Sequence, residues 1–353
     1  MTLADVLDAT STDGWLVLHE EVIVAEQYRA GLTHSTQHLL MSVTKSVVGA
    51  VAGILVDQGK LAPTDLVTVH VPELKVSRYL GATVRDLLDM RSGVLFREDY
   101  ADPTADVRRM EAAIAWRPGV EGVPPGLHHF LCELQADRPH GGPFNYRSSE
   151  TDVLGWVCER AAGAHMWDLV SELVWRPMGA EHDAHLLCDA LGDSVDNGGL
   201  TATLRDVARF GQLLLSAGAS AGRQVIPRSW LADAWSVDYD VRAAFAASPA
   251  EAALPGSWYR NQLWVLPGPH GDILICMGIY GHLVRVDPAT RTVMVKLSSW
   301  FTAQYPALLF DTLLACDAVA TALSGRAGQR GRFGAAPARG IITGHAVVSP
   351  WAT

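Results

Sequence analysis

Hydrophobic and polar positions along the chain change their period several times, and these changes predict the order of its elements. Alternating apolar runs predict two strands near the start, at 14–19 and 21–28, joined by a tight turn. Further strands are predicted near the other end, at 261–266, 272–279, 282–287 and 292–297. Helical spacing marks residues 43–56, 84–90, 151–162, 203–217 and 306–323. Residues 94–145 are irregular and rich in Pro, Gly and His, which is typical of a long functional loop region.

This order of elements predicts an α+β fold. Strands from the two ends of the chain would form one antiparallel sheet flanked by helices, and the middle of the chain would form an inserted, mainly helical lobe. We expect a single catalytic domain over residues 1–323, with a sheet lobe from about 12–60 and 200–323 and a helical lobe from about 61–199. Residues 324–353, rich in Gly, Ala and Arg, predict a flexible tail.

Composition narrows the class of protein. The 353 residues are 49% hydrophobic, enough for a large core, and the formal net charge of −10 argues against nucleic acid or an acidic membrane as partner. Five scattered cysteines without C-x-x-C spacing are expected to be reduced thiols, as in a cytoplasm. The first residues lack the features of a secretion signal, and no run was expected to reach the length of a membrane span.

The most informative chemistry lies in Ser42 and Lys45, which stand three residues apart at the start of a predicted helix. This spacing places the hydroxyl and the amine on one helix face. The alternative is a polar helix start with a solvated lysine. Residues 46–56, however, are apolar on nearly every side, which predicts a buried helix and favours a neutral amine able to take the serine proton.

Two other segments could complete such a site. Tyr146 precedes a predicted helix, and a phenol near a lysine can relay protons, although an ordinary loop aromatic is the alternative. The strand segment 276–282 contains glycines that let a ligand approach the backbone, so one of its N–H groups could join that of Ser42 in an oxyanion hole. A plain bulge is the alternative there. Trp264 and Trp300 flank these strands and would line an acyl pocket or simply pack in the core.

Several segments in order resemble the serine β-lactamase-like superfamily, related to class C β-lactamases and penicillin-binding proteins. They are Ser42-Val43-Thr44-Lys45, residues 83–93, Tyr146-Arg147-Ser148, and residues 198–203 with 206–211. The loop at 98–100, the Tyr-x-Ser form and the segment 278–281 are most similar to 6-aminohexanoate-dimer hydrolases and family VIII carboxylesterases.

The resemblance implies roles for individual residues. It implies that Ser42 is the acylated nucleophile, Lys45 its proton acceptor and Tyr146 the acid that protonates the leaving group. The backbone N–H groups of Ser42 and His282 would hold the oxyanion. The substrate-binding residues implied are Tyr100, Ser148, Asn197, Ile279, Tyr280 and Gly281, with Trp264 in the pocket wall.

Two departures from the β-lactamase pattern affect the expected substrate. Ser148 stands where those enzymes have Asn, and Ile279-Tyr280-Gly281 stands where they have Lys-Thr-Gly. The missing lysine removes a cation that would hold a substrate carboxylate, so an ester or small linear amide is expected. A β-lactamase or D-amino-acid peptidase, and a catalytically silent binding or sensor domain, are the alternatives.

We expect no metal and no cofactor, because the histidine pairs lack H-E-x-x-H context. The partner is expected to be a small ester or amide, without nucleic acid or membrane, and a homodimer is compatible with the sequence.

Overall fold

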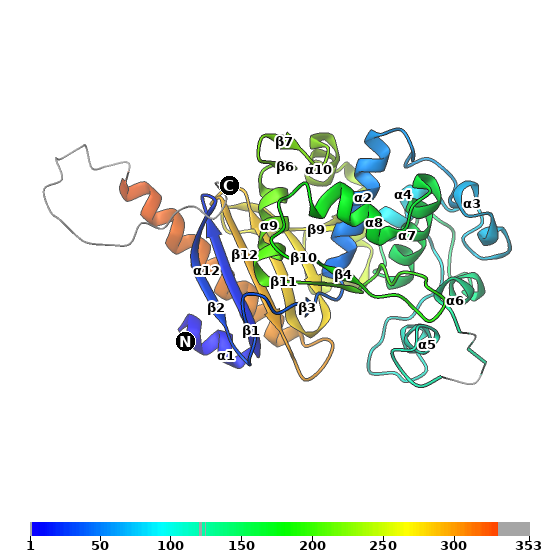
Figure 1. Cartoon of the computed structure of the whole chain (residues 1–353), viewed down its shortest axis with the longest axis horizontal. Coiled ribbons are helices and arrows are strands. Elements are labelled where there is room, and N and C mark those ends of the chain that lie inside the picture. The colour runs from blue at the N-terminus through cyan, green and yellow to red at the C-terminus, as the bar shows by residue number, and fades with distance from the viewer. Residues whose placement is uncertain (1, 120–121, 124, 331–353) are drawn as a thin grey trace, which may run out of the picture.

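The computed structural model describes residues 2–119, 122–123 and 125–330. A seven-stranded antiparallel sheet in the order β2-β1-β12-β11-β10-β9-β8 is its central element (Figure 1). Its strands are β1 (Thr12–His19), β2 (Val22–Tyr28), β8 (Trp258–Arg260), β9 (Leu263–Gly268), β10 (Gly271–Gly278), β11 (His282–Asp287) and β12 (Thr292–Ser298). The predicted α+β class and the antiparallel sheet made from both ends of the chain are therefore confirmed.

Short strands form two smaller sheets. The first has the order β3 (His38–Leu39), β5 (Leu200–Ala202), β4 (His185–Leu186), and the second pairs β6 (Ala219–Ser220) with β7 (Arg223–Gln224). The described helices are α1 (Leu3–Ala9), α2 (Val43–Asp57), α3 (Val67–His70), α4 (Val84–Leu88), α5 (Asp106–Ala113), α6 (Leu127–Glu133), α7 (Ser148–Ala162), α8 (Met166–Val170), α9 (Leu204–Leu215), α10 (Arg228–Trp235), α11 (Tyr239–Ala246) and α12 (Pro306–Arg330).

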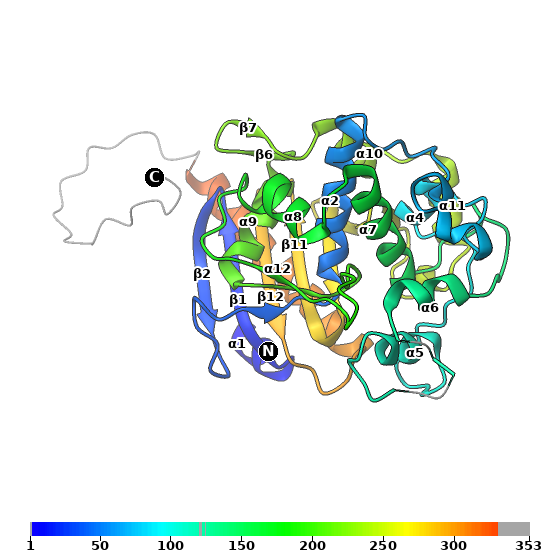
Figure 2. The same cartoon turned by 45° about the vertical axis from the view of Figure 1, so that its right-hand side comes forward.

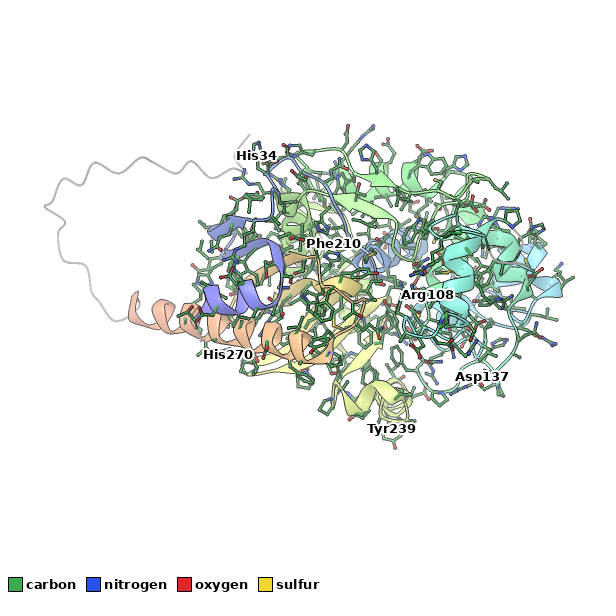
Figure 3. All side chains as sticks on the ribbon, turned by 90° about the horizontal axis from the view of Figure 1, so that it is seen from below. His34, Arg108, Asp137, Phe210, Tyr239 and His270 are labelled. Atoms are coloured by element: carbon green, nitrogen blue, oxygen red, sulfur yellow. The ribbon has the colours of Figure 1, made fainter. Side chains whose placement is uncertain are left out.

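Alternation along the strands gives the sheet two buried faces. Leu16 and Val284 point to the face covered by α2 and α9, whereas Trp15 and Met294 point to the face covered by α12 and α1. Figure 2 shows α2 between the sheet and the helical region that contains α4, α6 and α7. Figure 3 shows α12 lying along the edge of the molecule beside α1, with His270 of the β9–β10 turn next to it.

The helix α2 is apolar all round, as predicted, because it is packed on every side. Its residues 43–55 are all buried, and Gly53 lets the ring of Trp230 lie against its backbone, since an added Cβ would come within 2.5 Å of that ring. At α4, Thr83 accepts a hydrogen bond from the backbone of Asp86, and this capping box explains why that helix begins where predicted.

Three predictions need correction. Residues 94–145 contain the helices α5 and α6, whose buried residues Met110 and Phe130 anchor them to the core, so this region is not irregular throughout. The strand predicted at 261–266 is β9 but begins two residues later, because Asn261 and Gln262 have φ of 55° and 64° and form the turn between β8 and β9. The helix predicted to end at residue 323 continues to Arg330; the remainder of the predicted tail lies outside the described residues.

The expectation that no segment reaches membrane-spanning length is also wrong. By length and composition alone, Pro306–Gly325 of α12 is long and apolar enough to cross a membrane. Its buried residues Cys316 and Ala320 pack on the sheet, and 17% of the most apolar part of this segment is buried within the protein. Its outward side chains Phe310 and Leu314 are 48% and 65% exposed.

Candidate active site

The tight backbone turn before α2 fixes Ser42. Met41 has φ of 49°, a left-handed conformation that a side chain adopts only when its surroundings hold it there. The backbone N–H of Leu40 donates to Leu200 O at 2.8 Å. At the end of β10, Gly278 lies so close that an added Cβ would come within 2.7 Å of Leu40 O. The nucleophile candidate is therefore held between β5 and β10.

Lys45 lies one helical turn beyond Ser42 and is 1% exposed. Its Nζ lies 2.9 Å from Ser42 Oγ, 3.1 Å from Ser148 Oγ and 2.7 Å from Asn197 O. Burial lowers the pKa of Lys45 from 10.5 to about 8, against the opposing effect of nearby Glu98 and Asp152. The structure thus brings four of the predicted site residues together around one buried amine.

Glu98 is a member of this cluster that sequence reasoning did not assign. Its Oε1 accepts from Ser148 Oγ at 2.9 Å and from the Tyr100 hydroxyl at 3.0 Å, and its Oε2 accepts from Ser148 N at 2.7 Å. Since Ser148 donates its only hydroxyl proton to Glu98, its oxygen is left to accept from Lys45. The similarity of the loop at 98–100 to that of 6-aminohexanoate-dimer hydrolases was the sequence signal that could have identified Glu98 as a site residue.

A second carboxylate, Asp152, holds the other acceptor of Lys45. Asp152 Oδ1 accepts from the backbone N–H of Asn197 at 2.9 Å, and both of its oxygens accept from Asn197 Nδ2, at 2.9 and 2.7 Å. Burial raises the pKa of Asp152 to about 6, although Lys45 acts to lower it. Asp152 stands four residues after Ser148 in α7, and this same-face spacing was the available sequence signal.

Tyr146 lies beside the amine, within an aromatic cluster. Lys45 Nζ is 5.2 Å from the centroid of its ring, which packs against Trp264 at 5.3 Å and Tyr259 at 6.0 Å between centroids. Burial and the charge of Glu98 raise the pKa of Tyr146 above its ordinary value of 10.0, while contact with the Ser42 side chain lowers it. The phenol therefore keeps its proton at neutral pH.

The corner between β10 and β11 carries the third predicted motif. Ile279–Gly281 form one 3₁₀ turn, with Tyr280 at φ of 64° and Gly281 at φ of 90°. An added Cβ on Gly281 would lie 2.3 Å from the ring of Trp300, so only glycine fits. His282 follows, buried, and its Nδ1 accepts from Ser298 N at 3.3 Å. Burial lowers the pKa of His282 well below 6.5 and keeps the ring neutral.

Ser42 lines two cavities. The larger, about 300 Å³, is also lined by Tyr146, Trp264, Gly281 and His282. The smaller, about 20 Å³, is lined by Tyr100 and Asn197, and Ile279 contributes to both. Tyr280 lies outside the lining of these two cavities; its backbone N–H donates to Ala303 O at 2.8 Å and its carbonyl accepts from Trp300 N at 3.2 Å. Within the described ranges, no group of three metal-ligating side chains gathers.

Comparisons with known proteins identify the family of this chain. The sequence profile of the β-lactamase family matches residues 2–314. The chain is 36% identical to the 6-aminohexanoate-dimer hydrolase of Paenarthrobacter ureafaciens over 320 residues, which cover 89% of this chain and 81% of that enzyme.

Solved structures show the same fold. A structure from Bacillus anthracis, provisionally described as a 6-aminohexanoate-dimer hydrolase, superposes with a TM-score of 0.84 and 27% identity, over 92% of this chain and 83% of that one. EstCE1, described as a hydrolase with promiscuous acyltransferase activity, superposes with a TM-score of 0.69 and 18% identity, over 89% of this chain and 98% of its own. At that identity the likeness establishes the fold alone.

Proposed function

The chain belongs to the β-lactamase family of serine hydrolases, and from this premise we propose that it cleaves esters and small linear amides through an acyl-enzyme on Ser42. The observation that carries the proposal is the environment of Lys45 Nζ, with two fixed oxygen acceptors and the Ser42 hydroxyl as its third neighbour.

A neutral amine has two N–H donors and one lone pair. Asn197 O accepts one N–H, and Ser148 Oγ, whose own proton is used on Glu98, accepts the other. The lone pair of Lys45 is then directed at Ser42 Oγ. With a pKa of about 8, roughly a tenth of the amine is neutral at pH 7 and about half at pH 8, so Lys45 acts as the general base for Ser42.

The remaining steps follow from the other groups at Ser42. Ser42 Oγ attacks the carbonyl carbon, and the backbone N–H groups of Ser42 and His282 hold the resulting oxyanion. Tyr146, which keeps its proton, delivers it to the leaving alcohol or amine and recovers a proton from Lys45. Water then cleaves the acyl-enzyme along the same proton path, which returns free Ser42.

The substrate class follows from the third motif. Ile279-Tyr280-Gly281 offers no cation to hold the carboxylate that a β-lactam or peptide C-terminus carries. Esters and linear amides with uncharged ends need no such cation, and an amide of that kind is the first to test. The linear dimer of 6-aminohexanoate, for which the similar Paenarthrobacter enzyme is named, ends in a carboxylate and tests whether this site accepts one. Nitrocefin and a D-Ala-D-Ala peptide test the β-lactamase and peptidase alternatives.

The decisive test is covalent labelling. A fluorophosphonate probe should add one adduct to the peptide containing Ser42, and Ser42→Ala should remove both the label and ester turnover while its thermal unfolding stays cooperative. A catalytically silent protein would take up no label, and a Ser42→Ala variant with parental turnover would contradict the nucleophile assignment.

The role of Tyr146 has its own test. Tyr146→Phe should slow hydrolysis of alkyl esters and amides by about 10²–10⁴. Measured as kcat/KM, which reports acylation, hydrolysis of p-nitrophenyl esters should slow much less, because p-nitrophenolate leaves without being protonated. Equal losses on both classes of substrate would contradict the role of Tyr146 as the acid.

We propose a cytoplasmic location, supported by the five free cysteines. The proposed partner is a small ester or amide, with neither nucleic acid nor a membrane involved. The homodimer stays a prediction that sedimentation equilibrium would test.

A further inference from the structure

The two cavities at Ser42 differ in size and in chemistry. Apolar side chains dominate the larger cavity, and its outer wall comes from the first turns of α12; we call this larger cavity the α12 chamber. Residues that define it are Leu254, Met277, Leu283, Trp300, Leu309 and Phe310. At roughly 30 Å³ for each water-sized group, its volume of about 300 Å³ accommodates on the order of ten non-hydrogen atoms.

Charge in the α12 chamber has one sign. Glu98 is the only Asp, Glu, Lys or Arg among the described residues that line it, and the burial of His282 keeps that imidazole neutral. The smaller cavity likewise has Glu111 as its only residue of those four types among the described lining.

Nearby cations are already engaged. Lys45 donates to the acceptors described above, and Arg108 Nη1 pairs with Glu111 at 2.7 Å. Buried Lys296 donates to Thr10 O at 3.1 Å, outside the lining of both cavities. A carboxylate at the far end of a substrate arm would therefore enter a chamber whose described lining offers it no ion pair.

We propose that the α12 chamber binds one uncharged, unbranched apolar arm of the ester or amide, up to about eight carbons long, and that it rejects arms ending in a carboxylate. This inference rests on the proposed hydrolase function and names its substrate class. Each methylene moved from water into such a chamber should improve kcat/KM about fourfold until the space is filled.

The outer wall also identifies residues that set the length of this arm. Leu309 is partly buried and faces the chamber, whereas Phe310 stands at its rim with half of its surface exposed. Leu314 lies one turn further along α12, is 65% exposed and is outside the chamber lining, so it provides a matched control on the same helix.

The test uses two ester series and three variants. One series varies the acyl chain of p-nitrophenyl esters from two to ten carbons; the other varies the alcohol of alkyl acetates, followed by pH-stat. We expect kcat/KM to rise with length in one series and to level off near eight carbons. If the acyl series is the one that responds, the adipate mono-p-nitrophenyl ester, with a terminal carboxylate, should react at least tenfold more slowly than the hexanoate ester; if the alcohol series responds, the acetate of 6-hydroxyhexanoate should react at least tenfold more slowly than hexyl acetate.

Variants locate the effect. Leu309→Trp fills the chamber. In the responsive series it should lower the ratio of kcat/KM for the ester with an eight-carbon arm to that for the ester with a two-carbon arm at least tenfold. Phe310→Ala should lower this ratio by a smaller factor, and Leu314→Ala should leave it unchanged. Rates independent of length in both series, or equal rates in the responsive series for the ester whose arm ends in a carboxylate and its uncharged counterpart, would overturn the proposal. If the parent enzyme hydrolyses no ester at all and takes up no fluorophosphonate, the proposed function itself fails.

Discussion

Replacement of Asp152 by Asn tests how the fold adjusts the general base. Asp152 and Glu98 both raise the pKa of Lys45, against the lowering effect of burial that brings it to about 8. Asn keeps the shape of the Asp152 side chain and removes its charge. The pKa of Lys45 should therefore fall.

The size of the shift follows from the chemistry of the contact. A neighbouring opposite charge moves a pKa by about 1–3 units, and the Asn197 amide lies between the two groups, so we expect a shift of about 1 unit. Because Lys45 must be neutral to accept the serine proton, activity rises with pH through its pKa. The acid limb should thus move from about 8 to about 7, and the neutral fraction at pH 7 should rise roughly fivefold.

The assay is the pH profile of kcat/KM for a p-nitrophenyl ester. The pH at which the acid limb rises is compared between variants. The maximal rate is not compared, because the loss of hydrogen bonds to Asn197 lowers it independently. Asp196→Asn is the matched control. Burial raises the pKa of Asp196 well above 3.8, and Asp196 is not among the charges that shift the pKa of Lys45, so its replacement should not move the limb. An unmoved or raised limb in Asp152→Asn, or an equal shift in Asp196→Asn, would refute the reasoning.

Other predictions concern stability. Lys45→Met should abolish turnover yet stabilise the protein by up to about 3 kcal/mol at pH 7 in urea unfolding, because the lowered pKa makes burial of the charged amine costly below pH 8. This gain should shrink as pH rises from 8 toward 10.5, and a destabilised Lys45→Met would contradict it. Gly281→Ala should lower the free energy of unfolding by about 2 kcal/mol or more, because the new Cβ clashes with Trp300 and the backbone there is left-handed. The same variant should reduce kcat by about 10²–10³ if it displaces the neighbouring oxyanion donor. Gly59→Ala, with φ of 69° and no atom within 4 Å, should lose only about 1 kcal/mol and keep full activity; equal losses in the two glycine variants would rule out the clash.

Sequence reasoning predicted the elements whose signals are local. The run at 43–56 is apolar on every side because α2 is buried, and the alternating runs at both ends form the sheet. The short helices α5 and α6 were missed because helices of seven or eight residues depend on tertiary packing rather than on their own sequence.

The same limit applies to the site. Ser42 and Lys45 belong to one helix, so their spacing alone predicts their contact. Glu98 meets Ser148 across 50 residues, and Asn197 meets Asp152 across 45. Periodicity carries no information about contacts at that separation, so these partners required the structure.

The pairing of β1 with β12 has a consequence for synthesis of the protein. Trp15 of β1 lies opposite Lys296 of β12, so a strand near the start of the chain finds this partner only after the ribosome has made residues 292–298. Until then the nascent chain carries apolar strands with unpaired edges and an unfinished oxyanion corner, which makes it prone to aggregation. A translation product that stops before residue 292 should therefore be both inactive and dependent on chaperones.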